Sequence, residues 1–552
     1  MTSLRSNPPS VARPYTLCIL GLVVCVTLAS SRLQGLLINS TLLAAGTLML
    51  GLPLGTLLAV AVVKTSMPAR RLVEGLMLVL LFVPLYVHAA AWQAALGHGG
   101  WLKAENSTTI WFTGWTASIW VHGFAAIPWV FLFVATALRS VRPELEEESL
   151  QDASPGRVLG WVSLRGALSG IVAAALWVAV ICFGEIAVTD LFQVRTFAEE
   201  IYTAANLGVL ANPLEMPAAG EPTLKDVPQL ANQDLWIGTG VVVALVLGAL
   251  ASVWSWLPTA DGVSTSEPWV WNLRSSRWFV VIVIAAVMLI ILVAPTASLL
   301  SKAGATTTQV EGQITRSWSA SKSGLMLLSS FWEHRREWGW SLAIGSTAVV
   351  AATFVGAVLA WALRTRYLPA LPTALLLALG LSIPGPLLAV WIIQIMNHPD
   401  DSFFWPLTWC YNHTIVAPSL VQFLRALPLT TLLLWSQFAS ISQDVLDSAT
   451  SEGASWWRQL LGIALPLRWA AVIAAAAMAM IVAISDLAAT LLVAPPGVST
   501  LSMRIFGLLH YGSEDRVSAL CLALAVAVGL IVFLASLVLR VNNRQRRPAG
   551  EQ

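Results

Sequence analysis

Long apolar runs alternate with short polar segments along the chain, and this pattern predicts the fold class. A membrane-spanning helix needs about 20 mostly apolar residues. Six such runs precede a polar stretch from Pro258 to Arg277, and six follow it. The runs cover residues 15–31, 34–63, 72–96, 114–138, 167–192, 233–256, 278–295, 339–363, 370–396, 414–438, 468–494 and 517–540. We therefore expect an all-α polytopic membrane protein with about twelve transmembrane helices.

Proline and the first run both affect this helix count. Transmembrane helices tolerate proline when neighbours satisfy the freed carbonyl groups, so we expect no break at Pro53, Pro84, Pro128, Pro384 or Pro428. The first run follows two arginines, ends in small residues and could be a cleaved signal peptide. We favour an uncleaved helix, because the second set opens with a matching extra run from Phe279 to Pro295.

The composition supports a membrane protein and excludes other classes. Of 552 residues, 57% are hydrophobic and 11% are charged, and the mean hydropathy is +0.75, which is too apolar for a water-soluble fold. A net charge of +2 is too small for a nucleic-acid binder. None of the five lysines follows a glycine, so a phosphate-binding loop for ATP hydrolysis cannot be written.

Catalytic and metal-binding chemistry is also not indicated. The five cysteines form no CxxC pair, which argues against a disulfide framework or a zinc site. No Ser/His/Asp group, histidine cluster or carboxylate pair stands out in a loop, and no His/Asp/Glu spacing would hold a metal tightly. We expect no enzyme activity, no cofactor and no metal site.

The basic residues predict the orientation in the membrane. Cytoplasmic loops carry an excess of Lys and Arg. If the amino terminus is cytoplasmic, most of the 31 Lys and Arg residues fall on the inner side, although Arg335 and Arg336 count against this arrangement. We expect both termini in the cytoplasm.

The two sets of runs are copies of each other. A displacement of 300 residues aligns Pro84 with Pro384, His122 with Gln422 and Pro128 with Pro428, and one of 301 aligns Glu146 with Asp447 and Glu185 with Asp486. The displacement is 304 by Ile201 and Ile505. Because each copy has an even number of spans, both enter the membrane in the same direction, as in parallel repeats. We expect one transmembrane half at 1–276 and another at 277–552.

Each copy contains a polar loop with the pattern of a helix, a turn and a second helix. Ser154 and Ser455 are suited to cap the second short helix, and Pro155 suits its first position. Apolar residues in a water-facing loop usually mark a docking surface; here they are Leu150, Val158 and Leu159 in the first loop and Trp456, Trp457 and Leu460 in the second. A cytoplasmic protein partner is therefore expected; the alternative is that the loops only anchor helices at the membrane interface.

The second loop resembles the E-A-A-x-x-x-G loop of permease subunits from binding-protein-dependent ABC importers, and the likeness covers nearly the whole chain. It keeps Gly453, Ala454, Ser455, Arg458, Leu465 and Pro466. The first loop departs from the pattern, with Asp152 at the glycine position and Arg165 at the proline. Pro84 and Pro384 with their neighbours, and the Gly184-Glu185 and Ser485-Asp486 pairs, look like the iron(III)-type branch with two fused halves.

This resemblance implies a type I importer permease in the bacterial inner membrane. It implies two separate cytoplasmic ATP-binding subunits, seated on coupling loops at 144–165 and 444–466, and an extracytoplasmic substrate-binding protein. The outer segments Arg195–Gln233 and Thr296–Trp338 are the expected landing area for that protein. The coupling residues are Glu146, Ala153, Ser154, Arg157, Leu164, Asp447, Gly453, Ala454, Ser455, Trp457, Arg458 and Pro466.

Several polar residues fall within the predicted spans. Glu185, Asp486, His122, Gln422 and Arg425 are candidates for a translocation path, since ionisable groups in a membrane are costly unless hydrated or paired. The alternative is structural: the carboxylates cap a neighbouring turn, and the histidine is a hydrogen-bonded core residue.

The cargo is open at this stage. Iron(III) or a small chelate is the first expectation, and thiamine, polyamine or phosphonate are alternatives within the same class. An ion-driven secondary transporter is a more distant alternative, disfavoured because the spans lack a dense set of buried charges.

Overall fold

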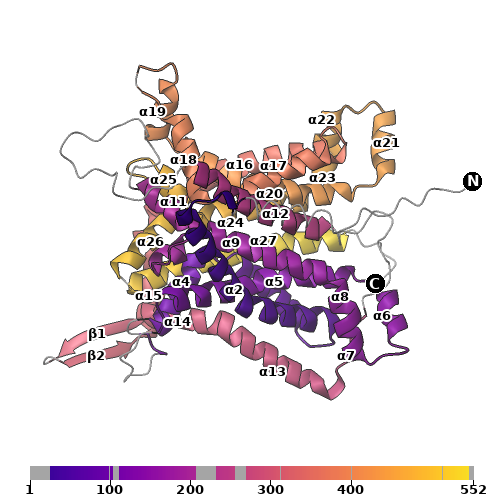
Figure 1. Cartoon of the computed structure of the whole chain (residues 1–552), viewed down its shortest axis with the longest axis horizontal. Coiled ribbons are helices and arrows are strands. Elements are labelled where there is room, and N and C mark those ends of the chain that lie inside the picture. The colour runs from indigo at the N-terminus through magenta and orange to yellow at the C-terminus, as the bar shows by residue number, and fades with distance from the viewer. Residues whose placement is uncertain are drawn as a thin grey trace, which may run out of the picture.

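The computed structural model describes residues 25, 27–97, 100–102, 111–206, 232–254, 269–310, 313–399, 401–512 and 514–545. The fold is almost entirely helical (Figure 1). The elements up to the middle of the chain are α2 (Ser31–Lys64), α3 (Arg70–Leu81), α4 (Leu85–Leu96), α5 (Gly114–Ser140), α6 (Pro143–Ser149), α7 (Pro155–Val158), η1 (Leu159–Ser163), α8 (Leu164–Gly166), α9 (Leu168–Gly184), α10 (Ala187–Leu191), α11 (Phe197–Asn206) and α12 (Asn232–Trp254).

From α16 onward the rest of the chain repeats the order that begins at α2, with α19 as an additional helix. Its elements are η3 (Arg274–Ser276), α13 (Arg277–Met288), η4 (Leu289–Val293), α14 (Ala294–Ala303), β1 (Ala305–Val310), β2 (Gln313–Trp318), α15 (Ala320–Glu333), α16 (Arg335–Arg364), α17 (Ala370–Ser382), α18 (Gly385–Met396), α19 (Trp405–His413), α20 (Val416–Ala439), α21 (Gln443–Ser451), α22 (Trp456–Gln459), η5 (Leu460–Ala464), α23 (Leu465–Leu467), α24 (Trp469–Ser485), α25 (Thr490–Val493), α26 (Leu501–Tyr511) and α27 (Glu514–Gln545).

The expected all-α membrane fold is confirmed. Among the described residues, seven helices are long and apolar enough to cross a membrane, or up to eleven if each of four bent pairs is one span. These correspond to eleven of the predicted runs. The other run, at 15–31, lies mostly outside the described residues, so the count of twelve stays a prediction.

Two prolines break their helices, contrary to the sequence-based expectation. α3 and α4 meet at an angle of 101°, and α17 and α18 at 100°. Pro84 and Pro384 stand at these corners with extended backbone, ψ 149° and 141°. A proline lacks an N–H and disfavours the helical conformation of the residue before it. Pro53, Pro128 and Pro428 remain inside straight elements, as expected.

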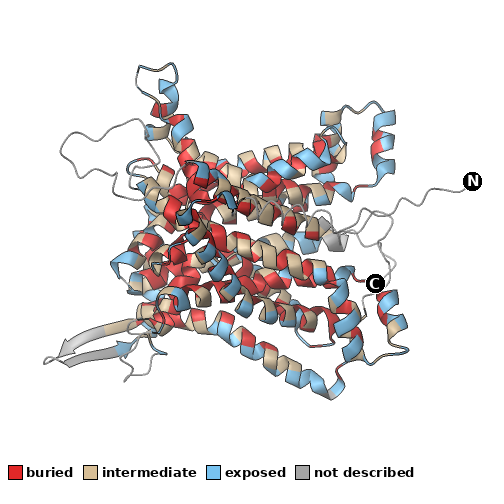
Figure 2. Ribbon diagram, viewed as in Figure 1, coloured by how far each residue is buried: buried red, intermediate tan, exposed pale blue. Residues whose placement is uncertain are grey.

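The helices pack in the same way in both copies. α2 lies against α5 and α9, and their counterparts α16, α20 and α24 pack together likewise. Two apolar clusters join the copies: one combines α4 with α24, α26 and α27, and the other combines α2, α11 and α12 with α17 and α18. Figure 2 shows buried residues concentrated within the bundle and exposed ones at its ends and periphery.

The ends of the bundle differ in structure. The short helices α6, α7, α21 and α22 lie at one end of the long axis, on the right in Figure 1, while α19 and the β1–β2 hairpin lie at the other. The two strands pair antiparallel, with Ala305 opposite Trp318. This hairpin and α15 fall within the expected landing segment Thr296–Trp338, for which no strand was predicted. Of the segment Arg195–Gln233, residues 207–231 lie outside the described residues.

Candidate functional site

The two predicted loops have the same architecture at the same end of the bundle. Loop 1 comprises residues 143–166 and loop 2 comprises residues 443–467. In each, a first short helix is followed by a turn, a second short helix and a π-helical turn, η1 or η5. The second segment then meets the following membrane helix at 58° in loop 1 and 84° in loop 2. Both loops therefore lie at the right end of the bundle in Figure 1, with α21 and α22 at the upper right and α6 and α7 at the lower right.

Loop 1 is attached to the membrane helices by a buried ion pair. Lys64, the last residue of α2, and Glu146 of α6 both have side chains with 0% exposure. The Lys64 Nζ lies 2.7 Å from each Glu146 carboxylate oxygen, and Ser163 Oγ donates to Oε1 at 2.5 Å. Breaking a buried pair by removing one partner is strongly destabilising. Glu146 thus holds the loop together from inside rather than facing a partner.

Loop 2 uses an apolar cluster in the same place. Leu446 and Leu460 are buried with Trp361 of α16 and Phe438 of α20, whose rings meet edge to face at 5.9 Å. The basic residue at the end of α16, Arg364, instead donates to backbone carbonyls at the end of α20, at 3.3 and 3.1 Å. The same loop shape is therefore supported by a charged interior in one copy and an apolar one in the other.

This comparison changes the alignment of the repeat. Glu146 and Leu446 are buried at matching points of α6 and α21, whereas Asp447 is exposed and accepts a bond from Gln443 Nε2 at 3.0 Å. The structural counterpart of Glu146 is thus Leu446, and the predicted pairing with Asp447 is displaced by one residue. The extra residue of loop 2 lies in its turn, where Gly453 has a φ of 77° that glycine adopts without strain.

The turns and caps match the prediction in position. The Ala153 and Ala454 N–H groups bond back to Ser149 and Ala449 carbonyls at 3.0 and 2.9 Å. The Ser455 hydroxyl accepts from the Arg458 N–H at 3.4 Å, but the Ser154 side chain makes no such cap. Arg157, Arg458 and Pro466 are exposed, and Leu164 and Leu465 are half-buried.

The exposed apolar residues of the loops are only partly those expected. Val158 and Leu460 are buried in the loop interiors, with exposures of 0% and 1%, and Trp456 is half-buried and donates to Thr365 Oγ1. Trp457 is exposed as predicted. The side chains available to a partner are Leu145 and Trp161 on loop 1, and Val445, Trp457 and Leu461 on loop 2.

The candidate path residues come together as one polar group in each copy. Glu185, at the end of α9, accepts from the Val188 N–H at 3.0 Å, and its Oε2 lies 3.4 Å from His122 Nε2. Asp486, at the end of α24, lies 3.1 Å from Arg425 Nε and accepts from Thr490 Oγ1 at 2.6 Å.

Gln422 completes the second group by donating to Thr490 Oγ1 at 3.3 Å. Both carboxylates bind the backbone of the turn that follows their helix. This is the geometry of the structural alternative, and it leaves a role in translocation as an expectation.

A cavity of about 500 Å³ lies beyond these groups, between α10 and α11 of the first copy and α25 and α26 of the second. Asp190 and His510 both line it and form a direct pair, with Asp190 Oδ2 lying 3.2 Å from His510 Nε2. The hydrogen bond that His510 donates to the Asp190 carboxylate raises the pKa of His510, which lies outside the membrane-spanning helices. Sequence reasoning missed this pair because the two residues are not counterparts in the repeat.

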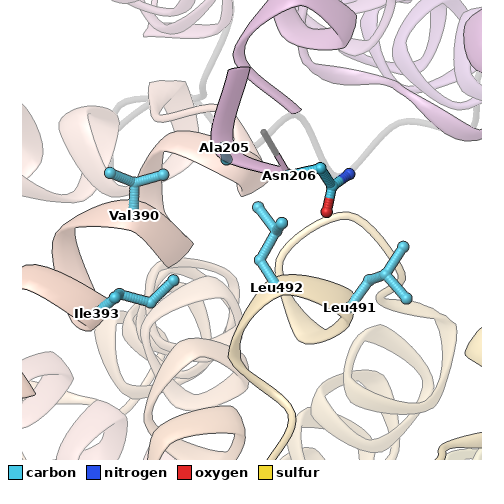
Figure 3. A pocket seen from close by; sticks show the side chains of 6 residues that line it. All are labelled: Ala205, Asn206, Val390, Ile393, Leu491 and Leu492. Atoms are coloured by element: carbon cyan, nitrogen blue, oxygen red, sulfur yellow. The ribbon is translucent and has the colours of Figure 1, made fainter. Parts of the chain in front are cut away.

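A second, smaller cavity of about 180 Å³ adjoins the first. Figure 3 shows its lining side chains, which are Ala205, Asn206, Val390, Ile393, Leu491 and Leu492. Asn206 and Leu491 line both cavities. Apart from Asn206 the lining is apolar, so this space extends the larger cavity toward α18 without adding charge.

Comparisons with known proteins point to transport. The chain is 35% identical over 96 residues to the putative 2-aminoethylphosphonate transport system permease protein PhnV of Salmonella typhimurium. That match covers 17% of this chain and 36% of the relative, so the chain spans about a third of the length of the aminoethylphosphonate relatives.

A longer match is to the putrescine transport system permease protein PotI of Escherichia coli K12. It is 23% identical over 215 residues, covering 38% of this chain and 73% of the relative. No protein-family model matches the chain. These relatives are named as transport permeases for 2-aminoethylphosphonate and putrescine, so they favour the phosphonate and polyamine alternatives over iron(III).

Proposed function

We propose that the chain is the permease subunit of an ATP-driven importer in a bacterial inner membrane, with both termini in the cytoplasm. Two separate ATP-binding subunits dock on loops 1 and 2, and an extracytoplasmic binding protein delivers the substrate to the opposite end. The observation that carries this proposal is the pair of loops with one architecture at one end of the bundle. The permease relatives support it.

The loops are built to pass on movement. Each is fixed to the end of a long helix by a buried interior, the Lys64–Glu146 pair in loop 1 and the Trp361–Leu446 cluster in loop 2. A short helix seated on a moving partner therefore carries its attached membrane helices as a rigid body. ATP binding to the partner would shift a two-state equilibrium of the halves, 1–276 and 277–552.

The partner would contact the exposed face of each loop. Trp457, Leu461 and Arg458 supply apolar surface and a charge on loop 2, and Trp161 and Arg157 do so on loop 1. Apolar and arginine side chains are favoured at the centres of protein interfaces. Glu146 and Ser154 position the loop rather than form this surface.

The transported solute is proposed from the names of the relatives. Both 2-aminoethylphosphonate and putrescine carry a primary amine, which is an ammonium group at neutral pH. We assign this chain to phosphonate or polyamine import in preference to iron(III).

The test is the substitution Trp457→Glu, with Trp405→Glu at the opposite end of the bundle as the matched control. Trp457 and Trp405 are similarly exposed, at 51% and 45%. The loop variant should insert normally but lose co-purification of the ATP-binding subunits and lose uptake, while the control keeps co-purification. Normal co-purification and uptake with Trp457→Glu would contradict the proposal.

The energy source of uptake distinguishes an importer from an ion-driven secondary transporter. Uptake that stops on ATP depletion and persists after collapse of the proton gradient supports the importer. The reverse dependence would identify a secondary transporter.

A further inference from the structure

The larger cavity lies where the two copies of the repeat meet. Its lining comes in pairs of counterparts: Tyr202 with Phe506, Thr203 with Gly507, Asn206 with His510 and Asp190 with Leu491. The first three pairs are displaced by 304 residues and the last by 301. A cavity lined by matching positions of two copies lies on the axis that relates them, which is where a shared path between two moving halves must run.

The paired residues that line the cavity occupy matching positions in the two copies but differ in chemistry. Asp190 supplies a carboxylate where the second copy has Leu491, and Tyr202 and Phe506 supply aromatic rings. Behind Thr203 lies Glu199, which accepts the Thr203 hydroxyl at 2.8 Å on one oxygen. Its other oxygen, Oε2, is buried and has no hydrogen-bond partner among the described residues. The first copy therefore supplies the carboxylate of the lining, and each copy supplies an aromatic ring.

The carboxylate of Asp190 is already engaged by a weak and replaceable partner. His510 lies 3.2 Å away, and its side chain is 41% exposed. Its other ring nitrogen, Nδ1, lies 3.0 Å from the Phe506 carbonyl oxygen. An exposed pair of this kind contributes little stability, so a ligand cation can displace the imidazole at low cost.

We propose that this cavity is a binding subsite for the ammonium group of a small aliphatic amine in transit, with Asp190 as its counter-ion. The inference rests on the proposed transport function and names the part of the substrate that the permease itself recognises. Aromatic faces and a carboxylate together favour a cation over an anion or a neutral solute. The cavity is widely open to solvent, and its volume of about 500 Å³ lies within the range of clefts that hold small molecules.

The ammonium group and His510 compete for the Asp190 carboxylate, so substitutions of Asp190 and of His510 should have opposite effects on binding. Removing the carboxylate removes the ligand's counter-ion and weakens binding. Removing the imidazole frees the carboxylate and strengthens binding. A pair that served only to hold α10 and α26 together would give a loss with either substitution.

The experiment measures binding of radiolabelled putrescine to the purified full-length chain in lipid nanodiscs, without ATPase subunits. Asp190→Asn should weaken binding at least about tenfold, the effect of one charge-assisted contact of about 1.4 kcal/mol. His510→Gln should leave binding equal or a few-fold tighter. Asp401→Asn and His413→Gln, exposed residues next to and within α19, are matched controls and should bind as the wild type does.

Besides normal binding by Asp190→Asn, three results would overturn the proposal. They are the absence of saturable putrescine binding up to millimolar concentration, a loss of binding in His510→Gln equal to that in Asp190→Asn, and stronger displacement of putrescine by sulfate than by unlabelled putrescine. Thermal unfolding of each variant shows whether a loss reflects misfolding, and Asp190→Glu should then restore binding if the charge is what matters.

Failure of this inference can be told from failure of the proposed function. Normal binding by Asp190→Asn overturns the subsite even where uptake requires ATP. Uptake that ignores ATP depletion and Trp457→Glu overturns the importer, whatever the cavity binds.

Discussion

Loops 1 and 2 have the same shape but opposite interiors. Loop 1 closes on Lys64, Glu146 and Ser163, all buried, and loop 2 closes on Trp361, Leu446 and Leu460. At the end of the supporting helix, the lysine of α2 turns inward, whereas Arg364 of α16 reaches the carbonyls of the neighbouring helix. The repeated feature is the geometry of the two loops, and the residues that stabilise it have diverged.

Because their interiors differ, the two loops should lose stability in different ways when a residue is substituted. An ion pair in a buried site depends on both of its partners, because either charge alone is costly there. An apolar cluster loses stability in proportion to the volume removed. A single substitution in the ion pair of loop 1 should therefore lower the stability sharply, and a second substitution at its partner should restore it. Substitutions in the apolar cluster of loop 2 should lower the stability in proportion to the volume that they remove.

The largest effect is expected from breaking the ion pair. Glu146→Leu leaves Lys64 charged and buried, and should cost about 3–5 kcal/mol, measured as a lowered thermal midpoint of the detergent-solubilised protein. The double variant Lys64→Leu with Glu146→Leu copies the apolar interior of loop 2 and should recover most of the loss. Equal midpoints for the single and double variants would show that the pair is not coupled as described.

The apolar cluster should give a somewhat smaller and graded loss. Leu446→Ala creates a cavity beside Trp361 and should cost about 2–5 kcal/mol, with Leu446→Val intermediate between the wild type and Leu446→Ala. Val445→Ala, at the exposed neighbouring position, is the control and should change stability by less than about 0.5 kcal/mol. A loss as large for Val445→Ala would place the core of loop 2 elsewhere.

The comparison extends to the polar groups at the ends of the membrane helices, which are centred on Glu185 in the first copy and Asp486 in the second. Arg425→Gln removes a charged partner from the buried Asp486 and should cost about 1–3 kcal/mol. His122→Gln copies the second half at the equivalent position and should cost less than about 1 kcal/mol, because His122 lies 3.4 Å from Glu185. The thermal unfolding midpoints of the two variants test this order of effects. A larger loss for His122→Gln than for Arg425→Gln would contradict it.

The smallest expected effect is a pH dependence of stability at the pair of Asp190 and His510, where the two copies meet. Asp190 raises the pKa of His510 in the folded chain, so the stabilisation is fully present below the ordinary histidine pKa of about 6.5. It is lost as the pH rises through the raised value. The difference in thermal midpoint between the wild type and His510→Gln should therefore be positive at low pH and vanish at high pH, and a difference that grows with pH would contradict the pairing.

The sequence predicted the spans and the loops better than the contacts between them. The apolar runs located the seven helices and four bent pairs that are long and apolar enough to cross a membrane, because a span needs about 20 mostly apolar residues. Pro84 and Pro384 were expected to be tolerated, yet they bend the chain by about 100°, since tolerance depends on neighbours that a single sequence does not name. Pro128 has the same local chemistry and stays within its helix.

Burial explains most of what was missed in the loops and cavity. Lys64 reads as a cytoplasmic end residue and Glu146 as a surface acid, but each is buried because the other is present. The insertion of one residue at the turn of loop 2 could not be located while Glu146 and Asp447 both appeared as acidic counterparts. The counterparts of Asp190 and His510 in the repeat are Leu491 and Asn206, which do not ionise, so the internal symmetry that pairs Glu185 with Asp486 did not point to them.

Labelling of single cysteines shows whether loops 1 and 2 both face the cytoplasm and meet an ATPase there. Cysteines at Trp161 and Trp457, in a chain whose native cysteines are replaced, are exposed to a membrane-impermeant maleimide in inverted and right-side-out vesicles. Both sites should react only in inverted vesicles, and both should be protected when the ATP-binding subunits are bound. Labelling of the two sites from opposite sides of the membrane would contradict the account.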